Sequence, residues 1–149
     1  MTNIDFYILE QQVSMARLHF LCRLTEKALS RQHRIVIAVD DESEAQTLSE
    51  YLWCFKPESF LAHQTERTLP HQQKRIDHAS PIQLVWDKPD DHHHDILINI
   101  GQQIPDNFSQ FNRVIEIVVQ EEDCLRSTRQ HFQFYRDRGY PLKSHTVEG

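Results

Sequence analysis

The chain alternates between short apolar runs and longer segments with apolar residues at helical spacing. The runs are rich in β-branched and aromatic side chains and occupy residues 5–9, 34–39, 82–86, 95–100 and 114–119. Short runs of this kind are typical of strands, and a run that is apolar at nearly every position suits a parallel strand covered on both faces. We therefore predict a strand at each of these five places.

Two of the intervening segments repeat apolar residues with the period of a helix. Residues 13–31 form the first. The second follows Asp41, which stands three residues before Glu44 at capping-box spacing, and it ends at Pro57. Its apolar stripe comprises Ala45, Leu48, Leu52 and Phe55. Strands that alternate with helices predict an α/β fold, a single domain over residues 1–149 with a central, mostly parallel sheet flanked by helices.

Two connections are strongly polar. Residues 62–80 show no clear period and contain several histidines and prolines, so we predict a long surface loop. Residues 88–94 join two predicted strands at a spacing that allows a hairpin. This connection includes His92, His93 and His94, but adjacent strand residues do not converge on one metal ion. We interpret the histidine run as a polar turn and predict no metal site.

Composition limits the class of protein. The 149 residues suffice for one domain with a sizeable core. No apolar run approaches the length needed to span a bilayer, and the first residues show no signal peptide. The three cysteines Cys22, Cys54 and Cys124 are far apart and form no CxxC pair. We therefore expect a reducing, cytoplasmic location without membrane attachment, in which the thiols serve as small core residues.

The acidic balance of the chain, a formal net charge of −6, is reversed in residues 124–143. The spacing of apolar residues in this segment predicts a third helix, which ends near Gly139 and Pro141. On a helical projection one sector gathers Arg126, Arg129, Gln133 and Arg136, and the next holds Leu125, Thr128, Phe132 and Tyr135. Arginines beside an aromatic edge favour a binding surface for a negative, partly apolar ligand. The alternative is a solvated helix face.

Two other features carry possible chemistry. Asp40 and Asp41 end a predicted strand, where carboxylates can hold Mg²⁺ as in receiver domains, but the later lysine of that fold has no counterpart. We interpret them as the N-terminal cap of a helix, with a small α/β enzyme or receiver-like domain as the alternative. No glycine-rich phosphate loop occurs, so the fold expected is Rossmann-like without one, and no cofactor is expected.

An aromatic residue stands outside the apolar stripe of the second predicted helix. Trp53 is rotated away from that stripe, and Pro57 and Phe60 follow it closely. The three side chains can form an exposed apolar patch of the kind that marks partner surfaces. Burial of Trp53 under the 62–80 loop is an equally good interpretation.

Several short stretches, taken in order along the chain, carry a family resemblance. They are Phe6–Leu9, Arg34–Ala38, Leu52 and Trp53 with Pro57–Phe60 and His63, Asp95–Asn99, and Phe132 with Tyr135, Arg136 and Gly139. With these stretches the chain resembles the chi subunit of the bacterial DNA polymerase III holoenzyme. Each stretch is modest by itself, but together they span nearly the whole chain.

The resemblance implies a non-catalytic adaptor of the clamp-loader assembly with two protein partners. The family binds the psi subunit and the acidic, Phe-ended C-terminal tail of single-stranded DNA-binding protein, so contact with nucleic acid is indirect. The psi-facing motif falls on Trp53, Pro57, Phe60 and His63, and the tail pocket on Arg129 and Phe132. A tyrosine is familiar in place of Phe132, and a lysine in place of Leu125, which stands beside Arg126. A module that binds RNA or DNA directly through the arginines is a further alternative, although the net charge disfavours it.

Overall fold

The computed structural model describes residues 2–12, 14–54, 64–65, 82–86 and 95–147. Its described strands form one sheet in the order β3-β4-β2-β5-β6-β1-β7, and every neighbouring pair is parallel. The strands are β1 Asn3–Leu9, β2 Ile35–Ala38, β3 Gln64–Thr65, β4 Ile82–Val85, β5 Ile96–Asn99, β6 Arg113–Val118 and β7 Leu142–Val147. The helices are α1 Ser14–Ser30, α2 Glu42–Cys54 and α3 Glu122–Asp137, with a short 3₁₀ turn at Phe108–Gln110.

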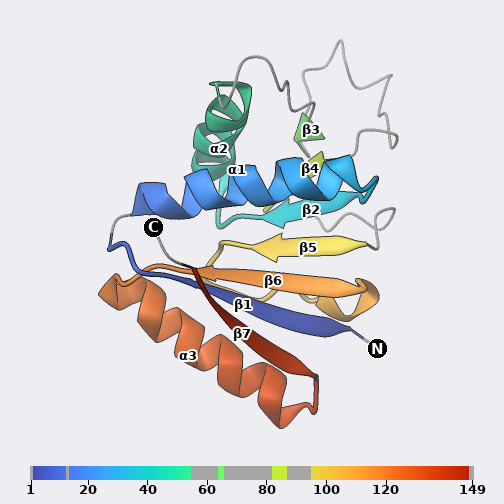
Figure 1. Ribbon diagram of the computed structural model, residues 1–149, viewed down its shortest axis with the longest axis vertical. Helices are drawn as coiled ribbons and strands as arrows, with labels where there is room; N and C mark the ends of the chain where they lie inside the picture. The colour runs from blue at the N-terminus through green and yellow to red at the C-terminus, as the bar shows by residue number, and fades with distance from the viewer. Residues whose placement is uncertain (1, 13, 55–63, 66–81, 87–94, 148–149) are drawn as a thin grey trace.

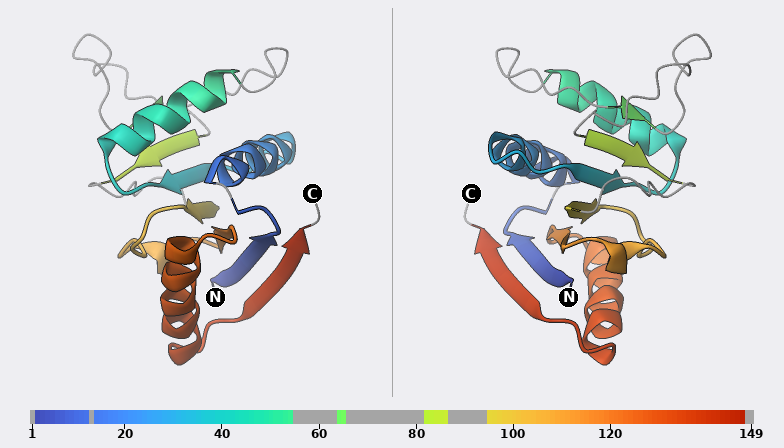
Figure 2. Two further views of the ribbon diagram at one scale, coloured as in Figure 1. Left: turned by 90° about the vertical axis from the view of Figure 1, so that its left-hand side faces the viewer. Right: turned by 90° about the vertical axis from the view of Figure 1, so that its right-hand side faces the viewer.

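The helices cover both faces of the sheet, as Figures 1 and 2 show. Helices α1 and α2 pack on one face, where the core includes Leu21, Leu48, Leu52, Ile37, Ile98 and Ile117. Helix α3 packs on the other face, where the core includes Phe6, Leu97, Val114, Phe108 and Tyr135. Alternate residues of the same strands supply the two cores, which explains why the central strands are apolar throughout. The sequence-based α/β class, with a parallel sheet between helical layers, is therefore confirmed.

Local signals set the ends of the helices. The carboxylate of Asp41 accepts a hydrogen bond from the backbone N–H of Glu44 at 2.8 Å, which confirms the predicted cap of α2. Helix α3 ends two residues before Gly139, whose φ of +80° lies in the left-handed region that favours glycine. Among the described residues, the structure contains no helix long and apolar enough to cross a membrane.

The predicted hairpin between residues 82–86 and 95–100 is wrong. Strands β4 and β5 do not pair with each other, because β2 lies between them and is parallel to both. All four residues of each strand are buried, as expected of interior parallel strands. A hairpin with one solvent-exposed face would leave alternate residues exposed. Residues 88–94, including the three histidines, lie outside the described residues, as does most of the predicted 62–80 loop. Of that loop, Gln64 and Thr65 form the short strand β3.

The edge strand β7 was not predicted from the sequence. Its four central side chains are exposed, and it pairs with β1 alone. An edge strand with polar side chains lacks the apolar run that identifies interior strands. The prediction that cysteines serve as core residues holds for Cys22, which is fully buried and whose thiol pKa burial raises to about 12.

Candidate functional site

A groove lies where α3 crosses the strands β1 and β7. It has a volume of about 340 Å³. Helix α3 supplies five of its described lining residues, β1 supplies two, and β7 supplies Ser144. We call it the α3 groove; its described lining residues are Phe6, Ile8, Thr128, Arg129, Phe132, Gln133, Arg136 and Ser144. Three of the arginine-sector residues and Phe132 are therefore brought together as the helical projection predicted.

The bottom of the α3 groove is aromatic. Phe6 is buried, and its ring centroid lies 5.5 Å from that of Phe132 at a tilt of 53°. Phe132 itself is 36% exposed, one of the two large hydrophobic side chains that the described part of the chain leaves in solvent. An aromatic pair with one member open to solvent offers a surface on which another ring can pack edge to face.

The rim of the α3 groove is cationic. Arg129 and Arg136 are exposed, and neither forms an ion pair with a described residue. No Asp or Glu is among the described residues that line the groove. Two guanidinium groups without a carboxylate partner remain available to bind a ligand carboxylate, and Gln133 between them adds a neutral amide.

Arg126 has a different environment. Its guanidinium lies 3.4 Å from the carboxylate of Glu122 and 3.8 Å from that of Asp123, both in the first turn of α3. It does not line the groove. Leu125, the position at which the resemblance led us to expect a lysine, is partly buried against the core under α3. The structure therefore brings Arg129 and Arg136 to the groove and leaves Arg126 one turn away from it.

A buried polar cluster fixes α3 to β6 of the sheet. The carboxylate of Glu116, in the middle of β6, accepts hydrogen bonds from the Tyr135 hydroxyl at 2.9 Å and the Asn99 amide at 3.1 Å. Its second oxygen lies 3.0 Å from Nδ1 of His131, and Nε2 of His131 lies 2.8 Å from the carbonyl oxygen of Gln102. Both ring nitrogens face acceptors, so the protonated imidazolium satisfies the site completely.

The pKa of His131 follows from this environment. Burial by itself lowers the pKa, but the hydrogen bond and the charge of Glu116, with the Gln102 carbonyl, outweigh it and raise the pKa above the ordinary 6.5. Burial also raises the pKa of Tyr135, as do the charge and the hydrogen bond of Glu116, so its hydroxyl stays a donor. The cluster thus anchors α3 through buried hydrogen bonds, and it becomes a buried ion pair when His131 is protonated.

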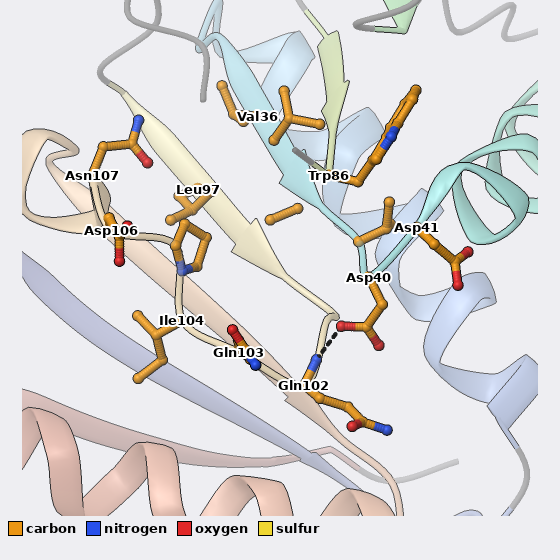
Figure 3. Close-up of a pocket in the computed structure, with 14 residues that line it drawn as sticks. Val36, Asp40, Asp41, Trp86, Leu97, Gln102, Gln103, Ile104, Asp106 and Asn107 are labelled. Carbon is orange, nitrogen blue, oxygen red and sulfur yellow. Dashed lines mark hydrogen bonds between the residues drawn. The ribbon is translucent and has the colours of Figure 1, made fainter. Parts of the chain in front are cut away.

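The second candidate region is a cavity of about 670 Å³ at the carboxyl ends of β2, β4 and β5 (Figure 3). Asp40 points across it, and its carboxylate accepts a hydrogen bond from the backbone N–H of Gln102 at 2.6 Å. Asp41 points away toward α2, where it serves as the helix cap. Both carboxylates therefore have structural partners, and no group of three or more metal-ligating side chains occurs within the described residues.

The side chains of the remaining predicted site residues lie outside the described part of the chain. Trp53 belongs to the last turn of α2, but its side chain lies outside the described residues. Pro57, Phe60 and His63 also lie outside them. The aromatic patch predicted from the sequence therefore stays a prediction.

Sequence reasoning missed several residues of the site. Phe6, Ile8 and Ser144 reach the groove only because β1 and β7 are neighbours in the sheet, and no local pattern indicates that pairing. Glu116 did leave a signal, because a lone carboxylate stands inside the apolar run VIEIVV. A charge at that position of a buried strand indicates a buried polar partner on a neighbouring element.

Comparisons of the sequence with known proteins return matches that share one name. Residues 1–143 match the family model described as DNA polymerase III chi subunit, HolC. A Pseudomonas aeruginosa protein named DNA polymerase III subunit chi is 35% identical, over 99% of this chain and 98% of that protein. The Escherichia coli protein of the same name is 26% identical, over 98% and 99%. The crystal structure of T4 UvsW matches with a TM-score of 0.69 over 99% of this chain and 42% of that chain, but at 9% identity the match shows the fold alone.

Proposed function

The chain belongs to the chi-subunit family of DNA polymerase III, and on that premise we propose that it is a non-catalytic replication adaptor with two protein partners. One is the psi subunit of the same holoenzyme. The other is the acidic C-terminal tail of single-stranded DNA-binding protein, so the adaptor would connect the polymerase assembly to coated single-stranded DNA.

The α3 groove is the observation that carries this proposal. A tail of acidic residues with a terminal Phe needs cations for its carboxylates and an apolar surface for its ring. Arg129 and Arg136 supply the unpaired cations, and Phe132 over Phe6 supplies the surface. Each charge-assisted hydrogen bond contributes about 1.5–3 kcal/mol, so two of them with one packed ring suit a modest, salt-sensitive affinity.

The geometry of the groove suggests a separate binding role for each of its residues. Arg129 and Arg136 would hold carboxylates, Gln133 would donate from its amide, and Phe132 would form a wall of the ring pocket. Arg126, held by two acidic side chains, would contribute through longer-range attraction alone. The terminal Phe would displace little more than water, because Phe132 is already exposed.

The psi subunit is proposed to bind at the end of α2 and the residues that follow. Ala45, Leu48 and Leu52 are buried in the core on the α2 side of the sheet, so the helical position of Trp53 is rotated away from them. Helices α2 and α3 lie on opposite faces of the sheet (Figure 2). Partners bound at the two helices would therefore not compete for the same surface.

A co-precipitation experiment tests the two-partner adaptor. The full chain is immobilised and offered intact single-stranded DNA-binding protein, the same protein without its last residues, and psi. We expect retention of the intact protein, loss of the truncated one, and simultaneous retention of psi. Equal retention of the intact and truncated proteins would overturn the tail assignment, and competition between psi and the tail would overturn the separation of the two surfaces.

A further inference from the structure

A second cationic pocket lies on the opposite face of the sheet from the α3 groove. It runs beside α1 and has a volume of about 390 Å³. Its basic rim consists of Arg23 and Lys27 of α1, Arg31 just after the end of α1, and Arg113 of β6. The apolar floor comprises Leu24, Ala28, Ile96, Ile98, Ile115 and Val147. We call this the α1 pocket.

The charge of the α1 pocket opposes that of the whole protein. The chain carries 22 acidic and 16 basic residues, yet no Asp or Glu is among the described residues that line this pocket. Arg23, Lys27 and Arg31 are exposed and form no ion pair with a described residue. Arg113 is compensated, because its guanidinium lies 3.1 Å from the carboxylate of Asp5.

The close spacing of these cations lowers the stability of the isolated protein. Arg23 and Lys27 are four residues apart on α1, so their side chains are neighbours on one face of the helix, and Arg31 follows in the turn directly after it. Like charges at this spacing destabilise a helix by a few tenths of a kcal/mol per pair. An anionic occupant would remove that repulsion, whereas water leaves it in place.

The shape of the α1 pocket sets the kind of occupant. Its α1 wall extends from Phe20 to Ala28, which is about 12 Å along a helix axis and matches about four residues of extended peptide, and Arg31 continues the rim just beyond the helix. Beneath the rim, Leu24, Ala28 and Val147 are partly exposed aliphatic side chains, and the isoleucines of β5 and β6 below them are buried. An occupant that matches both features carries carboxylates along one edge and aliphatic side chains on the other.

We propose that the α1 pocket binds an acidic, partly aliphatic peptide segment of a protein partner. The carboxylates of the segment pair with Arg23, Lys27 and Arg31, and its aliphatic side chains pack on the floor. Single-stranded nucleic acid fits less well, because it needs open aromatic faces for its bases. Here Tyr7 is stacked on His145, with centroids 4.8 Å apart, and Phe20 tilts against Tyr7 at 5.4 Å.

The α1 pocket is tested by amide NMR of the isotopically labelled full chain. The probe is a peptide of about eight residues, half of them Glu, with a central Ile-Leu pair and both ends blocked. Without Phe and without a free carboxyl terminus, this probe lacks the features proposed for the ligand of the α3 groove. We expect amide shifts over residues 20–31, 96–98 and 113–115, and a loss of affinity of roughly tenfold on Lys27→Glu.

The control variant is Arg126→Glu. It changes the net charge by the same amount on the opposite layer, and we expect it to leave the affinity within about twofold. Shifts confined to α3, an affinity that Lys27→Glu and Arg23→Glu both leave unchanged, or equal binding of a peptide with Gln in place of Glu would each overturn the proposal. Tighter binding of oligothymidylate than of the peptide would identify nucleic acid as the occupant instead. None of these outcomes depends on whether the α3 groove binds its tail.

Discussion

Replacing Glu116 with Leu should strongly destabilise the protein, because three buried donors lose their acceptor at once. Glu116 is 4% exposed, and its carboxylate accepts from or contacts His131, Asn99 and Tyr135. An unsatisfied buried donor costs about 1–3 kcal/mol, and loss of one partner of a buried ion pair costs about 3–5 kcal/mol. The substitution also removes the desolvation penalty of a buried carboxylate, which offsets part of this loss. We therefore expect the free energy of unfolding to fall by about 3–5 kcal/mol.

Replacing Glu116 with Gln should cost less, and the difference identifies the cause. The Gln amide can donate to Nδ1 of a neutral His131 while its oxygen still accepts from Asn99 and Tyr135, so every group keeps a partner. Only the ionic part of the interaction is lost. We expect a reduction of about 1–2 kcal/mol, well below that of Glu116→Leu.

The assay is urea unfolding followed by circular dichroism near pH 6, with Glu122→Gln as the surface control. Glu122 is exposed and paired with Arg126, so its substitution should change the free energy of unfolding by less than about 1 kcal/mol. If Glu116→Leu stays within about 1 kcal/mol of the parent protein, or matches Glu116→Gln, the anchoring role of the cluster is refuted.

Other predictions concern charge, capping and the partner surfaces. The pKa of His131 is raised in the folded protein, so the stabilisation from its protonated form is complete below about pH 6.5, the ordinary pKa. It is lost as the pH rises through the folded-state pKa. The difference in unfolding free energy between the parent and His131→Gln should therefore shrink as the pH rises. Asp41→Ala should lower stability by about 0.5–2 kcal/mol in urea unfolding and leave partner binding intact, whereas Asp41→Asn should be nearly neutral. Trp53→Ala should weaken psi binding by about 2–4 kcal/mol in calorimetry without affecting tail binding; an unfolded variant would instead mean that Trp53 is core. Phe132→Ala should weaken tail binding, whereas Phe132→Tyr should bind normally.

Local patterns predicted the parts of this protein that depend on local geometry. The apolar runs identified all the interior strands longer than two residues, because burial on both faces forces nearly every position to be apolar. The helical projection placed Arg129, Gln133 and Arg136 together because neighbours on a helix follow from its period alone.

Features that depend on distant neighbours were beyond local patterns. The hairpin prediction failed because the insertion of β2 between β4 and β5 is a property of the whole topology. Three of the eight described lining residues of the α3 groove were missed for the same reason, since Phe6 and Ser144 meet through the pairing of β1 with β7. The helical projection also placed Arg126 in the same binding sector as Arg129. A projection cannot show that the Arg126 side chain pairs with Glu122 and Asp123.

The most direct test of the proposed adaptor is a calorimetric titration of the protein with a peptide of the single-stranded DNA-binding protein tail, at low and at moderate salt. We predict that Arg129→Ala weakens binding by about ten- to a hundredfold, that Arg136→Ala and then Arg126→Ala have smaller effects, and that added salt weakens binding to the parent protein. Arg23→Ala, on the opposite face, should bind like the parent. An unchanged affinity of the Arg129→Ala variant, or an affinity that does not respond to salt, would contradict the assignment of the tail to the α3 groove.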